Sequence, residues 1–296
     1  MDYLSKFRAF QLDSPGSLFS FYKPGEYTLI EARLPKGGLE LLLDDLSFHG
    51  KERIDSLHIT SWDSDHCTYD DLVQIINHLR PERIEIPEYL PTSNDGQLCR
   101  SLITKYDDIH QKYVQNVHII SQDYLSKLQP AAKGAINNVL HPSIYNCNNK
   151  NDMSLIKLFR SAGFNVFSLG DCESAQLSAT ISANSFFTSE VDVLILAHHG
   201  ADNGFTTAEL LDTLKPKLAV CSSNYDNQYD HPSPEIRKLL AQRNIPLMTT
   251  KRGDVIIYQP DGYDYATAVN LISDNEIEES RVGFNPKRLI AASNAA

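Results

Sequence analysis

Short apolar runs separated by turn residues dominate the first thirty positions of the chain. Runs at 7–12, 18–22 and 27–30 are interrupted by Asp-Ser-Pro-Gly at 13–16 and by Lys-Pro-Gly-Glu at 23–26. Gly and Pro in such clusters favour tight turns, and short apolar runs between turns are typical of strands. The pattern therefore predicts an antiparallel meander near the N-terminus.

The rest of the chain alternates strand-like apolar runs with segments of helical periodicity. Leu72, Ile75, Ile76 and Leu79, for example, have the spacing of one helix face. This alternation predicts an α/β fold of two sheets with helices outside. Strands are predicted at 54–60, 83–87, 139–140, 154–159, 165–169, 192–197, 217–221 and 254–258, and helices at 69–79, 206–214 and 234–243.

The organisation along the chain predicts one main domain. We expect this domain to cover residues 1–258, to contain a helical insertion at 91–138, and to be followed by a polar C-terminal extension at 259–296.

Charge and cysteine content narrow the function classes. The net charge of -11 argues against a general nucleic-acid coat, which needs clustered Lys and Arg, but leaves room for a nuclease that uses bound metal ions. The chain has five cysteines and no CxxC pair, which favours a reducing compartment over a disulfide framework. These cysteines are Cys67, Cys99, Cys147, Cys172 and Cys221.

The start and the hydropathy of the chain bear on its location. No segment approaches about 18 uninterrupted apolar residues, so we expect no membrane span. The first 13 residues lack the apolar run of a signal peptide. We therefore expect a cytoplasmic protein.

Polar or ionisable residues stand beside apolar strand-like runs at five places. Carboxylate oxygens and imidazole nitrogens together suit divalent ions such as Zn or Mn. Two ions about 3.5–4 Å apart would form a site suited to phosphoester hydrolysis. The five places are Asp63, Asp65 and His66; Asn151 and Ser154; Asp171; His198 and His199; and His231.

Each place, taken alone, has a structural alternative. The acidic segment around Asp65 would also serve as an N-terminal cap for the helix that follows it, and Asp171 after Gly170 would also suit a turn. The adjacent His198 and His199 are harder to explain structurally, because buried imidazole nitrogens need partners. The order and spacing of all five places favour a functional site.

Six segments resemble motifs of the metallo-β-lactamase domain at the C-terminus of ComEC-type competence proteins. The resemblance spans roughly residues 7–258, and its most specific motifs are the one at 192–201 and the one formed by 215–222 and 227–232. It implies a metallo-β-lactamase fold, an αββα sandwich of two mixed sheets with outer helices, and a metal-dependent hydrolase. The segments are 60–66, 151–157, 170–173, 192–201, 215–222 and 227–232.

The chain departs from the family pattern at several of these motifs. Ser61 stands where the wider superfamily has its first histidine, and Asp63 stands at the second. Glu31 replaces an expected aspartate, and Gly16-Ser17 replaces Gly-Asp. The resemblance therefore implies an oxygen-rich site and favours phosphodiester cleavage over lactam hydrolysis.

The resemblance also implies roles for individual side chains. We expect two divalent ions, Mn or Zn, with Asp171 between them, and Asp65 as both ligand and catalytic residue. His198 is expected to be a further ligand or a donor that faces the phosphate. His199 is expected to support the ligands from behind or to act as the general acid, because its side chain should point away from that of its neighbour His198. The expected metal ligands are Asp63, Asp65, His66, Asp171, His198 and His231, and the expected substrate contacts are Asn151, Ser154, Asn227 and Tyr229.

The function expected from these residues is a metal-dependent phosphodiesterase, by resemblance a DNA nuclease with a nucleic acid substrate. One alternative is a small-molecule hydrolase of the same fold, which the acidic charge supports. The other is a metal-free interaction module, which Ser61 supports. A protein partner or a homo-oligomer is compatible with each of these alternatives.

Overall fold

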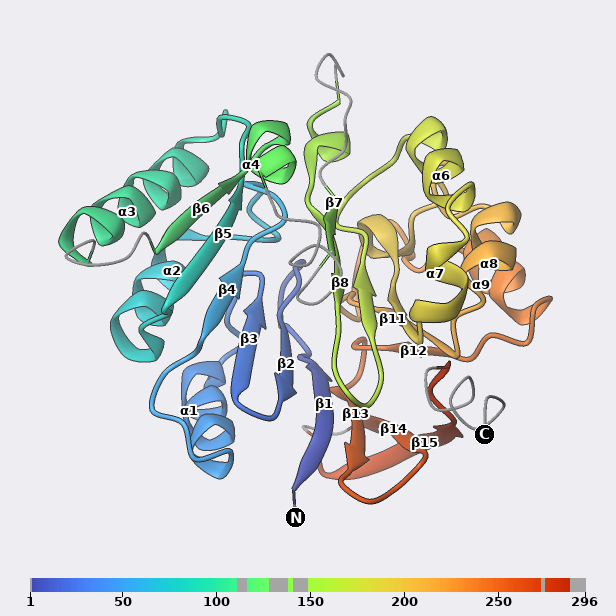
Figure 1. Ribbon diagram of the computed structural model, residues 1–296. Coiled ribbons are helices and arrows are strands. Elements are labelled where there is room, and N and C mark those ends of the chain that lie inside the picture. Colours follow the sequence, from blue (N-terminus) through green and yellow to red (C-terminus); the bar gives the residue numbers. More distant parts are fainter. Residues whose placement is uncertain (1, 111–115, 128–137, 141–148, 273–274, 288–296) are drawn as a thin grey trace.

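Two mixed β-sheets face each other in the computed structural model, and helices cover their outer faces (Figure 1). The structure describes residues 2–110, 116–127, 138–140, 149–272 and 275–287. The order of layers is helix, sheet, sheet, helix, and the αββα architecture predicted from the sequence is confirmed.

The larger sheet has nine strands in the order β15-β14-β13-β1-β2-β3-β4-β5-β6. The predicted N-terminal meander forms its centre, and β3 to β6 run parallel to one another. Its strands are β1 (Tyr3–Ala9), β2 (Phe19–Lys23), β3 (Glu26–Ile30), β4 (Ser56–His58), β5 (Arg83–Pro87), β6 (Val117–Ile120), β13 (Val255–Pro260), β14 (Ala266–Ile272) and β15 (Ile277–Phe284).

The smaller sheet has six strands in the order β12-β11-β10-β9-β8-β7. Strands β9 to β12 are parallel, whereas β7 and β8 are antiparallel to their neighbours. Its strands are β7 (Asn138–Leu140), β8 (Ile156–Phe159), β9 (Val166–Ser168), β10 (Val193–Ile195), β11 (Leu218–Cys221) and β12 (Leu247–Thr249).

Helices divide between the two outer faces. In Figure 1, α1 to α3 cover the nine-stranded sheet, and α6 to α9 cover the six-stranded sheet. The predicted helix at 69–79 is α2 followed by the π-helix η1. The helices are α1 (Gly38–Phe48), α2 (Tyr69–Gln74), η1 (Ile75–Leu79), α3 (Asn94–His110), α4 (Gln122–Lys127), η2 (Lys150–Met153), α6 (Ala175–Ser182), α7 (Phe186–Glu190), η3 (Ala197–Gly200), α8 (Ala208–Leu214) and α9 (Pro234–Ala241).

Three apolar clusters correspond to the interfaces between these layers. Leu42 of α1 and Leu72 of α2 pack on the nine-stranded sheet, while Leu210 of α8 packs on the six-stranded sheet. Phenylalanines such as Phe21 and Phe159 fill the space between the two sheets. Burial of apolar side chains on both faces of each sheet stabilises the sandwich.

Two segments of the predicted domain plan carry strands that the sequence pattern did not indicate. Within the expected insertion at 91–138, the described residues form α3, α4 and the strand β6, which pairs with β5. In the expected extension at 259–296, β14 and β15 add to the nine-stranded sheet beside β13. Six of the eight residues of β15 are exposed, so its pattern looks polar although Phe284 is buried.

The predictions about cysteines and about membrane spans can be compared with the structure only for the described residues. Cys147 lies outside the described residues, and the other four cysteines are buried and form no disulfide with one another. Among the described residues, no helix has the length and apolar character needed to cross a membrane.

Candidate metal centre

The loops that follow β3, β4, β9 and β10 meet at one edge of the sandwich. Parallel strands such as β3 and β4, or β9 and β10, end at the same edge of a sheet. The residues that follow these strands are therefore brought together, as is common for functional sites on rigid scaffolds. Backbone hydrogen bonds fix the loops to one another, for example from Ala32 N to His66 O and from His198 N to Gly170 O.

Four side chains from these loops form a compact group. One ligand atom from each of Asp65, His66, Asp171 and His199 lies within 4.8 Å of the others. His66 Nε2 is 2.6 Å from Asp171 Oδ2, and His199 Nε2 is 3.2 Å from Asp65 Oδ2. Two carboxylates and two imidazoles at this spacing are a donor set suited to a divalent cation.

The far side of the His66 ring is held by a buried carboxylate and a hydroxyl. His66 Nδ1 lies 3.2 Å from both Glu31 Oε1 and Thr60 Oγ1. Thr60 donates to Glu31 twice, from its backbone N at 3.0 Å and from its hydroxyl at 2.6 Å. A metal-binding histidine characteristically has such a partner on its second nitrogen, which fixes the orientation of the ring.

His199 is held in the same manner from the other sheet. Its Nδ1 is 2.9 Å from the carbonyl oxygen of Ser222, the residue that follows β11. The other ring nitrogen, Nε2, is thereby directed to the other three side chains of the group. The Ser222 hydroxyl in turn donates to Gly16 O at 2.9 Å. Both imidazoles of the group are thus oriented by groups outside it.

Negative charge is concentrated at this place. Burial lowers the pKa of His66, but the charges of Asp171 and Glu31 raise it, and the net pKa lies well above its ordinary value. Burial raises the pKa of Asp65, but the charge of His66 and the hydrogen bond from His199 outweigh it and lower that pKa. The electrostatic environment therefore favours a bound positive charge.

Three residues with side chains occupy the left-handed backbone region here. Glu31, His198 and His199 have φ values of 68°, 45° and 52°. Such conformations cost of order 1–3 kcal/mol each in non-glycine residues and concentrate at functional sites. The strain in this edge of the fold is consistent with a functional role for its side chains.

Ser61 and Asp63 lie beside the group of four but outside it. The Ser61 hydroxyl is 2.9 Å from Tyr89 OH, which also accepts a hydrogen bond from Trp62 N. Asp63 is half-buried, and burial and the charge of Asp65 raise its pKa. The expected place of a first histidine is therefore taken by a serine–tyrosine hydrogen bond.

The structure exchanges the positions expected for the two adjacent histidines. His199 joins the group of four, whereas His198 has its Nδ1 2.6 Å from Glu173 Oε1. Glu173 also accepts hydrogen bonds from Asn149 and Asn151. Asn151, expected to contact substrate, thus supports the carboxylate beside His198.

Ser154, the other residue expected near Asn151, lies behind the group. It is fully buried, and a Cβ atom added to Gly170 would stand 2.8 Å from Ser154 Cβ. Gly170 has a φ of 54°, and its lack of a side chain allows this close approach. Ser154 therefore packs under the loop that carries Asp171.

A cleft of about 410 Å³ opens beside the group of four. His198 and His231 are in its wall, and their ring centroids are 6.3 Å apart. Asn227 and Tyr229, which were expected to contact substrate, also line it. The full lining is Pro15, Gly16, Asp65, His198, His199, Ser223, Asn224, Asp226, Asn227, Gln228, Tyr229 and His231.

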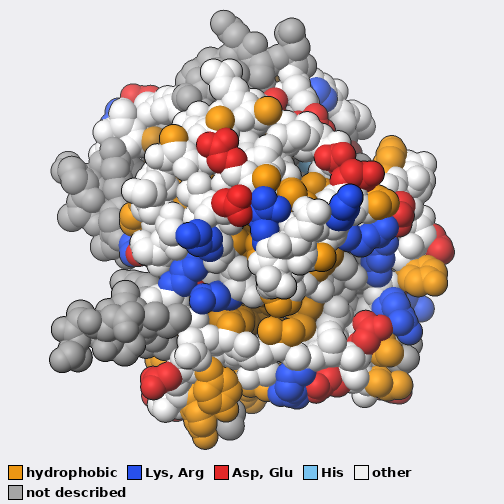
Figure 2. Space-filling view, turned by 90° about the vertical axis from the view of Figure 1, so that its right-hand side faces the viewer, with side chains coloured by type: hydrophobic (Ala, Val, Ile, Leu, Met, Phe, Trp, Pro, Cys, Tyr) orange, Lys and Arg blue, Asp and Glu red, His pale blue; other side chains and the backbone are white. Residues whose placement is uncertain are grey.

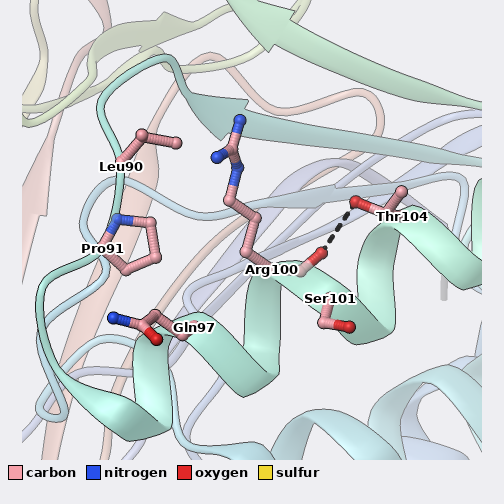
Figure 3. Close-up of a pocket in the computed structure, with 6 residues that line it drawn as sticks. All are labelled: Leu90, Pro91, Gln97, Arg100, Ser101 and Thr104. Atoms are coloured by element: carbon pink, nitrogen blue, oxygen red, sulfur yellow. Dashed lines mark hydrogen bonds between the residues drawn. The ribbon is translucent and has the colours of Figure 1, made fainter.

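A second hollow, of about 390 Å³, lies between the loop after β5 and one face of α3 (Figure 3). It is lined by Leu90, Pro91, Gln97, Arg100, Ser101 and Thr104. In Figure 3 the Arg100 side chain rises from α3 toward Leu90. These six residues include no His, Cys, Asp or Glu, so the hollow offers no metal ligands.

Comparisons with known proteins bear first on the fold. Igni18, a metallo hydrolase from the hyperthermophilic archaeon Ignicoccus hospitalis, is similar in structure, with a TM-score of 0.51 and 15% sequence identity over 85% of this chain and 98% of that one. The chain has a metallo-β-lactamase fold. The fold expected from the sequence motifs is thereby confirmed.

Sequence comparison gives the second finding. The chain is 25% identical to ComE operon protein 3 of Bacillus subtilis over 223 aligned residues. This alignment covers 75% of this chain and 26% of the Bacillus protein. It is 36% identical to competence protein ComA of Neisseria gonorrhoeae over 58 aligned residues. This alignment covers 20% of this chain and 8% of the Neisseria protein. The chain thus spans about a quarter of the length of the Bacillus protein. No family model matches it.

Sequence reasoning missed the parts of the site that support the group of four. Glu31 was noted only as a departure from a family motif, and Thr60 only as the start of another. Ser222 contributes a backbone carbonyl, a group that every residue has, so no sequence pattern distinguishes it. The acidic residue at 173 was visible after Gly170-Asp171, but its pairing with His198 depends on the folded loops.

Proposed function

We propose that the protein is a metal-dependent phosphodiesterase that cleaves nucleic acid. The observation that carries this proposal is the group of four ligand atoms, from two carboxylates and two imidazoles, beside an open cleft. The similarity to competence proteins supports a nucleic acid as the substrate.

The residues present fit a divalent cation. Asp65, His66, Asp171 and His199 would hold it, and both histidines have their second nitrogen directed to an oxygen outside the group. When bound, the cation would supply Lewis acidity, neutralising charge on phosphoryl oxygens and lowering the pKa of a nearby water molecule. Mn and Zn both suit this mixture of oxygen and nitrogen donors.

We propose one tightly held ion per chain, one fewer than the sequence motifs indicated. In the described part of the chain, one such group of ligand atoms was found, and Asp63, His198 and His231 are outside it. The Ser61 hydroxyl is occupied by Tyr89. Among the described residues, a second ion would therefore have no comparable group of converging ligand atoms.

His198 is placed to exchange a proton with the substrate. It lines the cleft, and its Nδ1 lies 2.6 Å from the Glu173 carboxylate, which fixes the orientation of the ring. From the cleft wall, His198 would act as a general acid and donate a proton to the leaving oxygen of a phosphodiester. This assigns to His198 the role that the sequence suggested for His199.

A second candidate function is a small-molecule phosphoesterase of the same fold. The residues that line the cleft include Asp65 and Asp226 but no Lys or Arg. On the face formed by α6 to α9, Lys and Arg side chains are interspersed with Asp and Glu (Figure 2). A polymeric phosphate chain usually binds a basic surface, so these observations favour a short substrate.

Cleavage assays with the purified chain test the proposal. We expect Mn- or Zn-stimulated cleavage of single-stranded DNA, double-stranded DNA or RNA, and loss of that cleavage in Asp65→Ala and His66→Ala. His78→Ala is the matched control, because His78 is an exposed histidine on η1 and should retain full activity.

The outcomes separate the two candidate functions. Absence of metal-stimulated cleavage of every DNA and RNA tested would refute the nuclease. Metal-stimulated hydrolysis of bis(p-nitrophenyl) phosphate without cleavage of any polymer would instead support the small-molecule phosphoesterase.

A further inference from the structure

The loop between β11 and α9 carries an aromatic side chain at the rim of the cleft. Tyr229 lines the cleft together with Asp65 and His199, yet the residue is 68% exposed. Its ring is stacked on that of His231, with centroids 5.5 Å apart and planes at 23°. One face of Tyr229 is therefore supported by a second ring, while much of the side chain remains open to solvent.

A row of rings connects this tyrosine with the group of four. The ring centroids are 5.8 Å apart between His66 and His199, and 6.2 Å apart between His199 and His198. The next steps are 6.3 Å from His198 to His231 and 5.5 Å from His231 to Tyr229. The row leads along the cleft from the metal ligands to its rim.

Hydrogen bonds hold the loop that carries Tyr229. The Asn227 side chain accepts from His231 N at 2.6 Å and donates to His231 O at 3.1 Å. Asp230 pairs with Arg237 at 3.2 Å and with Lys251 at 3.6 Å. The loop around the Tyr229–His231 stack is thus held by hydrogen bonds and ion pairs, which reduces the entropy lost when a ligand stacks on Tyr229.

The cleft offers an aromatic surface where a nuclease would often offer basic residues. Its lining includes no Lys or Arg. Every nucleobase has a flat face that stacks on an aromatic side chain, and this contact is worth about 1–3 kcal/mol per base. A base in a duplex is already stacked and paired, so only an unpaired base is available for the contact.

We propose that an unpaired nucleobase stacks on Tyr229 while a neighbouring phosphodiester reaches the group of four ligands, so that the protein prefers single-stranded nucleic acid. This inference rests on the proposed phosphodiesterase function. It assigns the Tyr229 ring to base recognition, whereas the sequence suggested a contact between Tyr229 and phosphate.

Binding is measured first, in EDTA, where no metal-dependent cleavage takes place. The probes are two fluorescein-labelled single strands of equal length, oligothymidylate and a fully abasic strand with the same phosphates. Fluorescence anisotropy should show tighter binding of oligothymidylate. Tyr229→Ala should weaken that binding by about 5- to 150-fold and leave the abasic strand unaffected, whereas Tyr229→Phe should bind as wild type does.

Tyr225 provides a matched control on the same loop. This residue is also 68% exposed, but it is not part of the cleft lining. Tyr225→Ala should therefore bind both strands as the wild type does. Equal binding of the two strands by wild type, or equal weakening by Tyr225→Ala and Tyr229→Ala, would overturn the assignment of Tyr229.

Cleavage in Mn then separates this inference from the proposed function. We expect Tyr229→Ala to raise the KM for oligothymidylate with little change in kcat, and a blunt duplex to be cleaved more slowly than the single strand. A blunt duplex cleaved as fast as the single strand would overturn the inference and leave the nuclease in place. Tyr229-dependent binding without cleavage by wild type would refute the nuclease and leave the stacking contact in place.

Discussion

A buried ion pair between the two sheets gives the sharpest prediction about stability. Lys157 of β8 donates to Glu85 of β5, and these two side chains are only 2% and 4% exposed. Glu85 also lies 2.8 Å from His58 Nδ1 and accepts from Arg83 at 2.9 Å. Burial raises the pKa of Glu85, but the charge of Lys157 and the hydrogen bond with His58 outweigh it and lower the pKa well below its ordinary value.

Replacement of Glu85 by Gln removes the carboxylate that Lys157 faces and leaves that ammonium buried without a counter-charge. Breaking a buried pair in this way costs about 3–5 kcal/mol. Lys157→Met should cost less, because Glu85 keeps its contacts with Arg83 and His58. The double variant should be more stable than Glu85→Gln alone, since no uncompensated ammonium remains.

Urea unfolding at pH 7 measures these differences in the free energy of unfolding. Glu82→Gln is the control, because Glu82 pairs with Arg53 at the surface, where 44% and 58% of the two side chains are exposed. Exposed pairs contribute about 0–1 kcal/mol. The reasoning is wrong if Glu85→Gln costs no more than Glu82→Gln, or if the double variant is the least stable of the set.

Three further predictions concern the metal centre and pH. Glu31→Gln should weaken Mn or Zn affinity about 10- to 100-fold by calorimetry, because Glu31 orients His66; unchanged affinity would contradict that role. Metal analysis should find one ion per chain in wild type and His198→Ala but not in His199→Ala, and the reverse pattern would restore the order expected from the sequence. Burial lowers the pKa of His58 in the folded protein below its ordinary value of 6.5. The stability that the neutral His58 contributes is therefore present above pH 6.5 and is lost as the pH falls through the folded pKa. In EDTA, the free energy of unfolding should fall less between pH 6.5 and 5 in His58→Gln than in wild type.

Much of the fold could be predicted because its strands are local patterns. The buried run at 193–197 is apolar over its whole length, as strands covered on both faces commonly are, and this pattern is visible in the sequence alone. The strand β15 was missed for the opposite reason, since its side chains are mostly exposed and only its pairing with β14 marks it as a strand. Pairing between distant segments leaves little trace in the sequence of either one.

The candidate site was predictable to the extent that it lies at strand ends. Asp65, His66 and Asp171 each follow an apolar run, and parallel strands carry such positions to one edge. The partners that orient them lie far away in sequence, as with Glu31 and His66 or Ser222 and His199. These contacts form only when the two sheets pack, so the sequence could suggest the ligands but not what holds them.

The exchange of roles between His198 and His199 shows where the local rule fails. Adjacent side chains point to opposite sides only while the backbone is extended. Here both histidines have left-handed backbone conformations, which cost of order 1–3 kcal/mol per residue when a side chain is present. The hydrogen bond from His198 N to Gly170 O and the contact of His199 Nδ1 with Ser222 O help to hold them there. Glycine would relieve the strain at either position, but it would remove the imidazole. We infer that both imidazoles are needed, because His199 completes the proposed metal centre and His198 lines the cleft.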